Sequence, residues 1–167
     1  MITSSKDFTL LEWARRLLSG KPHLAIGAEL NDDNPYMLRW YVIPRNRRLN
    51  IYVHKFMRSD DDRALHDHPW WFVSLLLRGS YAEVTERNVK IRQTGSIAFR
   101  PAKWRHRVAL LTAPTVQTKP WVIMQHPVPC WTLIITGPKS RLWGFWCRKE
   151  RFVPWNEWDI DAGCGED

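Results

Sequence analysis

Apolar and polar residues alternate in short runs along most of this chain, and turn-forming residues separate the runs. The pattern is clearest in residues 49–57, where Ile51 and Val53 alternate with Tyr52 and His54. Such alternation places successive side chains on opposite faces of an extended strand. The predicted strands cover residues 37–43, 49–57, 70–77, 81–85, 89–92, 96–100, 108–111, 121–124, 131–136 and 142–146. Many short strands with turns between them predict an all-β sandwich or barrel.

The beginning of the chain has a helical period instead, and it predicts a short N-terminal α-helix over residues 6–19. Ser19 and Gly20 would end this helix. Its apolar residues fall on one broad face, which comprises Leu10, Leu11, Trp13, Ala14, Leu17 and Leu18.

A chain of 167 residues is long enough for one domain with its own core. We therefore expect a single domain that spans residues 1–167. Its predicted parts are the helix at 6–19, a barrel core at about 37–147, a Trp-rich cover at 148–158 and an acidic, small-residue tail at 159–167. The chain contains 11 tryptophans, and those near the C-terminus are expected to cover the barrel or to form a dimer face.

Neither a membrane span nor a secretory signal is predicted. No stretch approaches the length of uncharged apolar sequence that a membrane helix needs, and the first residues lack the charged-then-apolar order of a signal peptide. The three cysteines, Cys130, Cys147 and Cys164, show no CxxC spacing. A disulfide framework is therefore not expected, and a reducing cytoplasm is the predicted location.

The net charge of +8 allows nucleic-acid binding but does not favour it. Lys and Arg occur in short dispersed groups, such as 45–48, 103–107 and 148–151, and no long basic run is present. Such groups are typical of solvated turns and rims, or of surfaces that attract small anions. The expected partner is a small molecule, with a homodimer as a further expectation, and nucleic acid is not expected.

The segment His66-Asp67-His68 carries the first sign of chemistry. On an extended chain, residues two apart point the same way, so His66 and His68 can converge on one point. His106 is the best candidate for a third imidazole on a neighbouring strand. Imidazole is a common ligand of zinc, iron, copper and nickel. The simpler alternative is that these histidines are structural or exposed.

Two spacings around these histidines resemble the motifs of the cupin family. The first motif reads G-x5-HxH-x3-4-E-x6-G; here His66 and His68 are followed, at that spacing, by Phe72 and Gly79, and Asp60 replaces the leading glycine. The second motif reads G-x5-P-x-G-x2-H-x3-N. Here it is matched by residues 95–110, with Gly, Pro and His at the family's places, Lys103 in place of the second glycine and Leu110 in place of the asparagine.

The resemblance covers about residues 60–110 and implies a jelly-roll fold, the double-stranded β-helix of the cupins. It implies one divalent metal ion held by His66, His68 and His106. Phe72 stands where the family has a glutamate ligand, and phenylalanine does not bind metal. Three-His cupins are known among the thiol dioxygenases, such as the cysteine dioxygenases, which use ferrous iron. The Ser-His-Tyr set of those enzymes has no counterpart in residues 131–136, so the thiol substrate is not carried over.

Other residues are candidates for completing the site. Arg58, Arg63 and Arg100 are candidates for clamping a substrate carboxylate or phosphate, or they pair on the surface with the aspartates at 60–62. His54 is a candidate fourth ligand or acid–base group, or else a packed strand residue. Asp67 lies between two ligands and should point away from the metal, where it would brace the loop.

Three classes of function remain. The first is an iron-dependent dioxygenase or hydroxylase that acts on a small anionic substrate. The second is an O₂-independent, metal-dependent isomerase, epimerase or lyase. The third is a module that binds a metal or ligand without catalysis. Fe(II) is the favoured metal, and zinc, nickel, manganese and copper are alternatives, because three imidazoles suit all of them.

Overall fold

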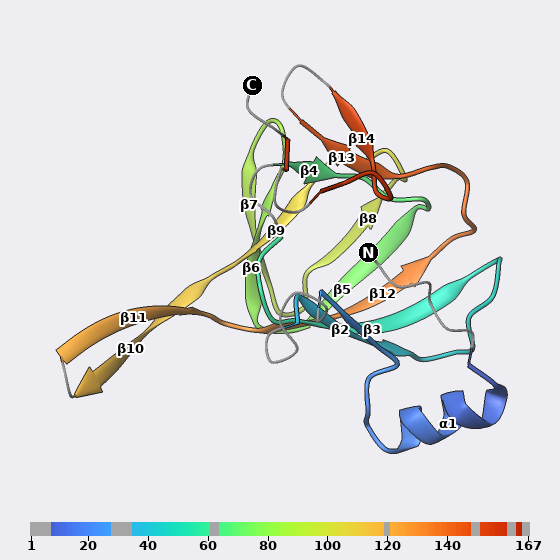
Figure 1. The fold of residues 1–167 in the computed structure, drawn as a ribbon, viewed down its shortest axis with the longest axis horizontal. Coiled ribbons are helices and arrows are strands. Elements are labelled where there is room, and N and C mark those ends of the chain that lie inside the picture. The colour runs from blue at the N-terminus through green and yellow to red at the C-terminus, as the bar shows by residue number, and fades with distance from the viewer. Residues whose placement is uncertain are drawn as a thin grey trace.

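Residues 8–27, 35–60, 64–118, 121–147, 151–159 and 163–164 are described by a computed structural model. One helix and a series of antiparallel strands make up this part of the chain (Figure 1). Their bounds are α1 Leu10–Leu18, β1 Leu24–Ile26, β2 Met37–Tyr41, β3 Asn50–Phe56, β4 Leu65–His66, β5 Phe72–Arg78, β6 Ser80–Val84, β7 Val89–Gln93, β8 Ile97–Arg100, β9 Arg107–Leu110, β10 Thr112–Thr118, β11 Trp121–Pro127, β12 Cys130–Thr136, β13 Gly144–Trp146 and β14 Phe152–Pro154.

The strand order is that of a jelly roll. One sheet has the order β1-β2-β3-β12-β5-β8, and a second contains β7-β6-β9. A bridge between His66 and His106 joins β4 to the start of β9, so the second layer continues as β4-β9-β6-β7. The successive strands β3 to β9 and β12 thus divide between two layers in the double Greek-key order of a jelly roll. The predicted all-β, cupin-type double-stranded β-helix with one N-terminal helix is confirmed.

The alternation read in the sequence decides which side chains enter the interior. In β3 and β12, buried residues alternate with partly exposed ones along the whole strand. The two strands pair with His54 opposite Thr132 and Tyr52 opposite Ile134, and all four of these side chains lie on the inner face. The inner face of this sheet therefore carries polar as well as apolar residues.

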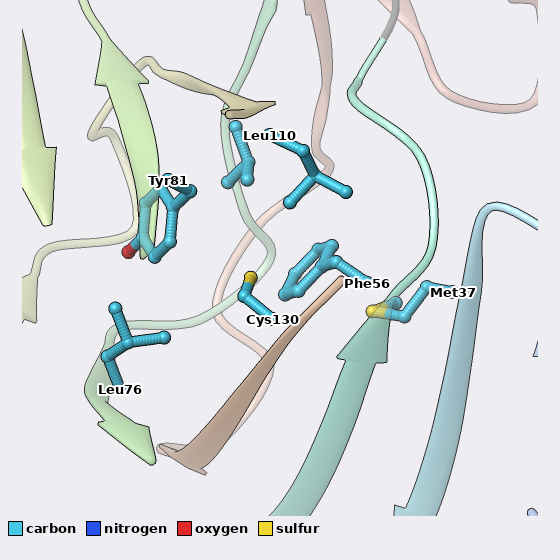
Figure 2. Packing of buried hydrophobic residues seen from close by; sticks show 7 residues of the cluster. Met37, Phe56, Leu76, Tyr81, Leu110 and Cys130 are labelled. Carbon is cyan, nitrogen blue, oxygen red and sulfur yellow. The ribbon is translucent and has the colours of Figure 1, made fainter. Parts of the chain in front are cut away.

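One end of the interior is closed by an apolar cluster. Figure 2 shows its side chains converging from strands of both layers. The cluster comprises Met37, Phe56, Leu76, Tyr81, Val108, Leu110 and Cys130. Cys130 is a free, buried thiol, and burial raises its pKa to about 12. It therefore serves as an inert packing residue.

The helix is shorter than predicted. Within the predicted span of 6–19, of which residues 6 and 7 are not described, α1 runs from Leu10 to Leu18. It begins with a capping box in which Thr9 and Glu12 exchange hydrogen bonds of 2.9 and 3.3 Å. On the predicted apolar face, leucines 10, 11 and 18 are exposed. Only a narrow stripe meets the sheet, where the Trp13 indole N–H donates to the carbonyl of Tyr41 at 2.8 Å.

The C-terminal segment packs beside β4 through the small sheet β14-β13-β4. Cys147 and Cys164 form a disulfide there, contrary to the expectation from the cysteine spacing. Their Cα atoms lie 5.6 Å apart because both residues pack in one cluster with Ala64, a proximity that chain folding and not sequence spacing creates. The cysteines therefore no longer support the prediction of a reducing cytoplasm.

The described part of the chain contains no helix that is long and apolar enough to cross a membrane. The hairpin of β10 and β11 pairs only within itself and extends away from the two layers (Figure 1).

Two neighbouring leucines provide a direct test of the inner face of β5. Leu76 is 2% exposed and Leu77 is 42% exposed. Leu76→Ala should lower the free energy of unfolding by about 3 kcal/mol through lost burial and a cavity, whereas Leu77→Ala should cost less than about 1 kcal/mol. Denaturant titration of both variants measures the difference. Similar losses in the two variants would contradict the register of this strand.

Candidate metal centre

The fold brings the three predicted ligands together. The ring centroids of His66, His68 and His106 lie 5.0 to 5.1 Å apart. One potential ligand nitrogen from each ring lies within 4.8 Å of the others. The structure therefore contains a group of three histidines that could hold a metal ion.

Local chain geometry explains this convergence. His66 and His106 face each other in an antiparallel bridge, with backbone hydrogen bonds of 2.9 and 3.0 Å in the two directions. Directly paired residues project their side chains to the same face. His68 follows His66 by two residues along an extended segment and projects the same way. Its backbone N–H donates to the carbonyl of Ala102 at 3.1 Å, which holds the segment against the next turn.

The spacing of the nitrogens fits coordination. The Nε2 atoms of His68 and His106 lie 2.9 Å apart. Two nitrogens bound to one metal at about 2.1 Å, at right angles to each other, lie about 3 Å apart. A direct hydrogen bond between the two rings gives a similar distance, so metal analysis has to distinguish the two cases.

Phe72 occupies the place of the missing glutamate and packs against the site. Its ring lies 4.6 Å from the His68 ring and 6.0 Å from the His106 ring. Among the described residues, the cluster of potential ligands contains only the three imidazoles. A metal bound there would keep the full positive charge of a divalent ion, because no carboxylate of the cluster neutralises it.

A buried carboxylate contacts His106 at the ring nitrogen that is not the potential metal ligand. Oε1 of Glu83 lies 3.2 Å from Nδ1 of His106, and the carboxylate accepts hydrogen bonds from Arg100 at 2.5 Å and from Arg92 at 2.9 Å. Burial alone would raise the pKa of Glu83, but its contact with His106 and its hydrogen bonds with Arg100 lower that pKa. Glu83 is therefore ionised, and it favours a proton on Nδ1 of His106, which leaves Nε2 free to bind metal.

His66 has a similar neighbour. Oδ2 of Asp60 lies 3.6 Å from Nδ1 of His66, and the carboxylate also accepts hydrogen bonds from the Val108 N–H and the Tyr36 hydroxyl. Burial lowers the pKa of His66 to about 4, although the Asp60 charge opposes the shift. Burial also lowers the pKa of His68 well below its usual value. Both imidazoles are therefore neutral at pH 7, the form that binds metal.

Asp67 points away from the ligands, as predicted, and braces the segment. It accepts hydrogen bonds from the Arg141 guanidinium, from the Gly144 N–H at 3.0 Å and from the Trp146 indole N–H at 2.9 Å. These bonds tie the His66–His68 segment to β13.

A cavity of about 610 Å³ adjoins the three histidines, which form part of its wall. Aromatic and aliphatic side chains supply much of the remaining wall, including Trp70, Phe72, Ile134, Trp143 and Trp155. Four cationic side chains also line it, namely Arg39, Arg45, Arg100 and Lys139. Among the residues that the structure describes, no Asp or Glu lines this cavity. A cavity of this size and charge suits a small anionic molecule.

The other predicted site residues differ in whether they line the cavity. His54 lines the cavity but stands outside the histidine cluster, and its Nε2 accepts a hydrogen bond of 2.8 Å from Arg39. Arg100 also lines the cavity, but it is buried and its guanidinium is engaged by Glu83. Arg58 is not among the lining residues, and Arg63 lies outside the described residues.

Sequence reasoning missed two residues that the structure places at the site, Glu83 and Arg39. Glu83 lies two residues after Tyr81 in a predicted strand, so the alternation already put it on the inner face. An acidic residue at an inward position was the available signal. Arg39 lies on the inner face of β2 by the same rule, opposite His54.

Comparison with known proteins yields matches to solved structures alone. No protein-family model matches the chain, and no curated protein matches it. The chain is 15% identical to a conserved protein with a double-stranded β-helix domain from Klebsiella pneumoniae, over 67% of this chain and 85% of that chain, with a TM-score of 0.47. It is 16% identical to an RmlC-like cupin from Shewanella frigidimarina, over 64% and 78% of the two chains, with a TM-score of 0.44. It is 13% identical to the DMSP lyase DddQ from Ruegeria pomeroyi, over 74% and 57%, with a TM-score of 0.49.

Acidification should weaken the fold through His54. Burial and the nearby Arg39 charge keep the pKa of His54 well below its usual value. Below about pH 6.5, His54 therefore binds a proton in the unfolded chain but not in the folded chain. Between about pH 6.5 and about pH 5, this difference lowers the free energy of unfolding by up to about 2 kcal/mol. Denaturant titrations near neutral pH and at about pH 5 should show a smaller loss in His54→Gln than in the wild type. Equal losses would contradict this assignment.

Two Glu–Arg pairs allow a test of whether Glu83 stabilises the fold and His106 as a metal ligand. Glu83 is buried with Arg100, whereas Glu86 pairs with Arg105 at 2.7 Å on the surface. Glu83→Gln should lower the free energy of unfolding by about 3–5 kcal/mol, because Arg100 keeps a buried charge without its partner. It should also weaken metal binding about 10- to 100-fold. Glu86→Gln, the control, should cost less than about 1 kcal/mol and leave metal binding unchanged. Indistinguishable variants would contradict the supporting role.

Proposed function

We propose that this protein is a metal-dependent enzyme that acts on a small anionic substrate, and that its chemistry is that of a non-haem iron dioxygenase or hydroxylase. The observation that carries the proposal is the group of three imidazoles on the wall of a cavity whose charged lining, among the described residues, is cationic. A site with three protein ligands leaves positions of the metal open for other molecules, which is typical of catalytic and not of purely structural metal sites.

The metal would be held by His66, His68 and His106, and ferrous iron is the favoured ion. Bound iron would supply open positions at which a substrate and O₂ can meet. Three neutral ligands favour an anionic substrate, because no ligand charge offsets that of the ion. Zinc, nickel, manganese and copper suit the same imidazoles, so O₂ uptake by iron-loaded protein is needed to identify iron as the functional metal.

The chain itself contributes orientation and the exclusion of water. Phe72 shields one side of the imidazoles, and the ring of Trp143 stacks on Trp155 with centroids 6.0 Å apart at the cavity wall. The contact of Asp67 with Gly144 and that of Glu83 with His106 hold the histidine-bearing segments in place. Such rigid support is what a reacting centre needs to keep its geometry.

A second candidate is an O₂-independent isomerase, epimerase or lyase in which the metal polarises a carbonyl group. The same histidines and the same cationic cavity support it. Among the described residues the histidine cluster contains no carboxylate, and this charge balance suits an anionic substrate for either candidate. A non-catalytic metal-binding module would need the histidines but not the cavity.

O₂ uptake distinguishes these candidates. Protein loaded with ferrous iron should consume O₂ in the presence of at least one member of a panel of small carboxylates and phosphates. His106→Ala should lower the rate at least about 100-fold, and zinc-loaded protein should give no uptake.

Turnover without O₂ in zinc- or manganese-loaded protein would replace the first candidate with the second. Absence of turnover under all of these conditions would contradict both enzyme candidates.

A further inference from the structure

We propose that Arg39 anchors the anionic group of the substrate, with the Thr132 hydroxyl in the same row of the sheet. This inference rests on the proposed function, because it assigns a residue to the substrate that the metal site would transform. It names a binding subsite on the sheet that carries no metal ligand.

The register of the large sheet places these residues in one row. Arg39 on β2 pairs with His54 on β3, and His54 pairs with Thr132 on β12. All three side chains line the cavity. Neighbouring strands lie about 4.8 Å apart, so the row forms a continuous polar strip across three strands.

Hydrogen bonding holds the Arg39 guanidinium in place and leaves donors for a ligand. Nε donates to Nε2 of His54 at 2.8 Å, and the guanidinium lies 4.9 Å from the centre of the Tyr52 ring. These contacts use one of the five N–H donors that an arginine carries. The planar fork of the other nitrogens suits two oxygens of a carboxylate or phosphate.

Among the described residues, the contacts of Arg39 do not balance its charge. His54 is neutral and Tyr52 is uncharged, and burial raises the pKa of the Tyr52 phenol. No carboxylate among the described residues lines the cavity. Arg100 offers the contrast, since Glu83 neutralises it at 2.5 Å. A partly buried cation without a counter-ion costs free energy, and an anionic ligand would remove that cost.

Two hydroxyl groups on the cavity wall also lack partners among the described residues. Oγ1 of Thr132 and Oγ1 of Thr136 are buried, line the cavity and have no hydrogen-bond partner among the described residues. Buried polar atoms nearly always have a partner. Both hydroxyls lie on β12, Thr132 in the row of Arg39 and His54, and Thr136 four residues further along the strand, opposite Asn50. The Thr132 hydroxyl can donate to an oxygen of a ligand that reaches Arg39.

These positions define a class of ligand. Arg39 and the three histidines line the same cavity. Apolar side chains such as Tyr52, Phe72 and Ile134 line the same cavity. The ligand is therefore a small molecule with a carboxylate or phosphate at Arg39 and a compact apolar body that extends toward the histidines.

Binding of simple probes tests the subsite directly. Isothermal titration calorimetry would compare benzoate, inorganic phosphate and the neutral benzyl alcohol on the purified protein. The wild type should bind benzoate or phosphate but not benzyl alcohol. Arg39→Gln should weaken that binding at least tenfold, whereas Arg47→Gln, which removes an exposed charge, should stay within twofold. Preference for phosphate over benzoate would support the same subsite with a phosphorylated ligand.

Unchanged binding in Arg39→Gln, or binding of benzyl alcohol as tight as that of benzoate, would overturn the proposal. The metal content of each preparation separates the two hypotheses. If Arg39→Gln loses the anion but keeps the metal, the subsite is supported whichever reaction the protein catalyses. If anion binding survives in Arg39→Gln but disappears in His106→Ala, the anion binds to the metal instead.

Thermal unfolding covers the case in which Arg39→Gln is poorly folded. Without ligand, Arg39→Met should keep or raise the Tm, because it removes a charge for which the described residues supply no counter-ion. Arg100→Met should lower the Tm, because it leaves Glu83 without its main partner. Benzoate or phosphate should raise the Tm of the wild type but not that of Arg39→Met. A Tm that falls as far in Arg39→Met as in Arg100→Met would show a structural role and overturn the proposal.

Discussion

The candidate site depends on one backbone bridge, which joins the β14-β13-β4 sheet to the β7-β6-β9 sheet. His66 and His106 exchange N–H donors and carbonyl acceptors at 2.9 and 3.0 Å, which joins β4 to β9 and sets their register. Side chains of paired residues then share one face, and His68 joins them from two residues further along. A slip by one residue would turn the imidazoles away from each other. Strand pairing, and not a flexible loop, therefore positions the three potential ligands.

Charge compensation gives the arginines of the cavity different roles. Arg100 is paired with Glu83, and Glu83 in turn contacts His106, so this arginine belongs to the support of the histidines. In the part of the chain that the structure describes, Arg39 contacts two uncharged groups, the His54 imidazole and the Tyr52 ring. An unbalanced cation is a cost to the folded protein unless a ligand supplies the negative charge. The same residue type thus serves the fold at one position and, in our proposal, the substrate at another.

The sequence predicted those features that depend on short-range periodicity. Alternation identified the strands, and the spacing of His66 and His68, together with the motif around His106, identified the three histidines and the jelly roll. Features that depend on which strands become neighbours were missed. The pairing of Arg100 with Glu83 is one, and the Cys147–Cys164 bond is another. Tertiary packing creates both proximities, and neither follows from the distance between residues along the chain.

The central claim is that the three histidines hold one metal ion. Inductively coupled plasma mass spectrometry on untagged protein tests it most directly, with single alanine variants of His66, His68 and His106 and with His126→Ala, an exposed histidine, as the control. We predict about one transition-metal ion per chain in the wild type and in His126→Ala, and loss of the ion in the other three variants. Absence of metal from the wild type after incubation with ferrous iron and zinc, or an unchanged content in the three variants, would contradict the account.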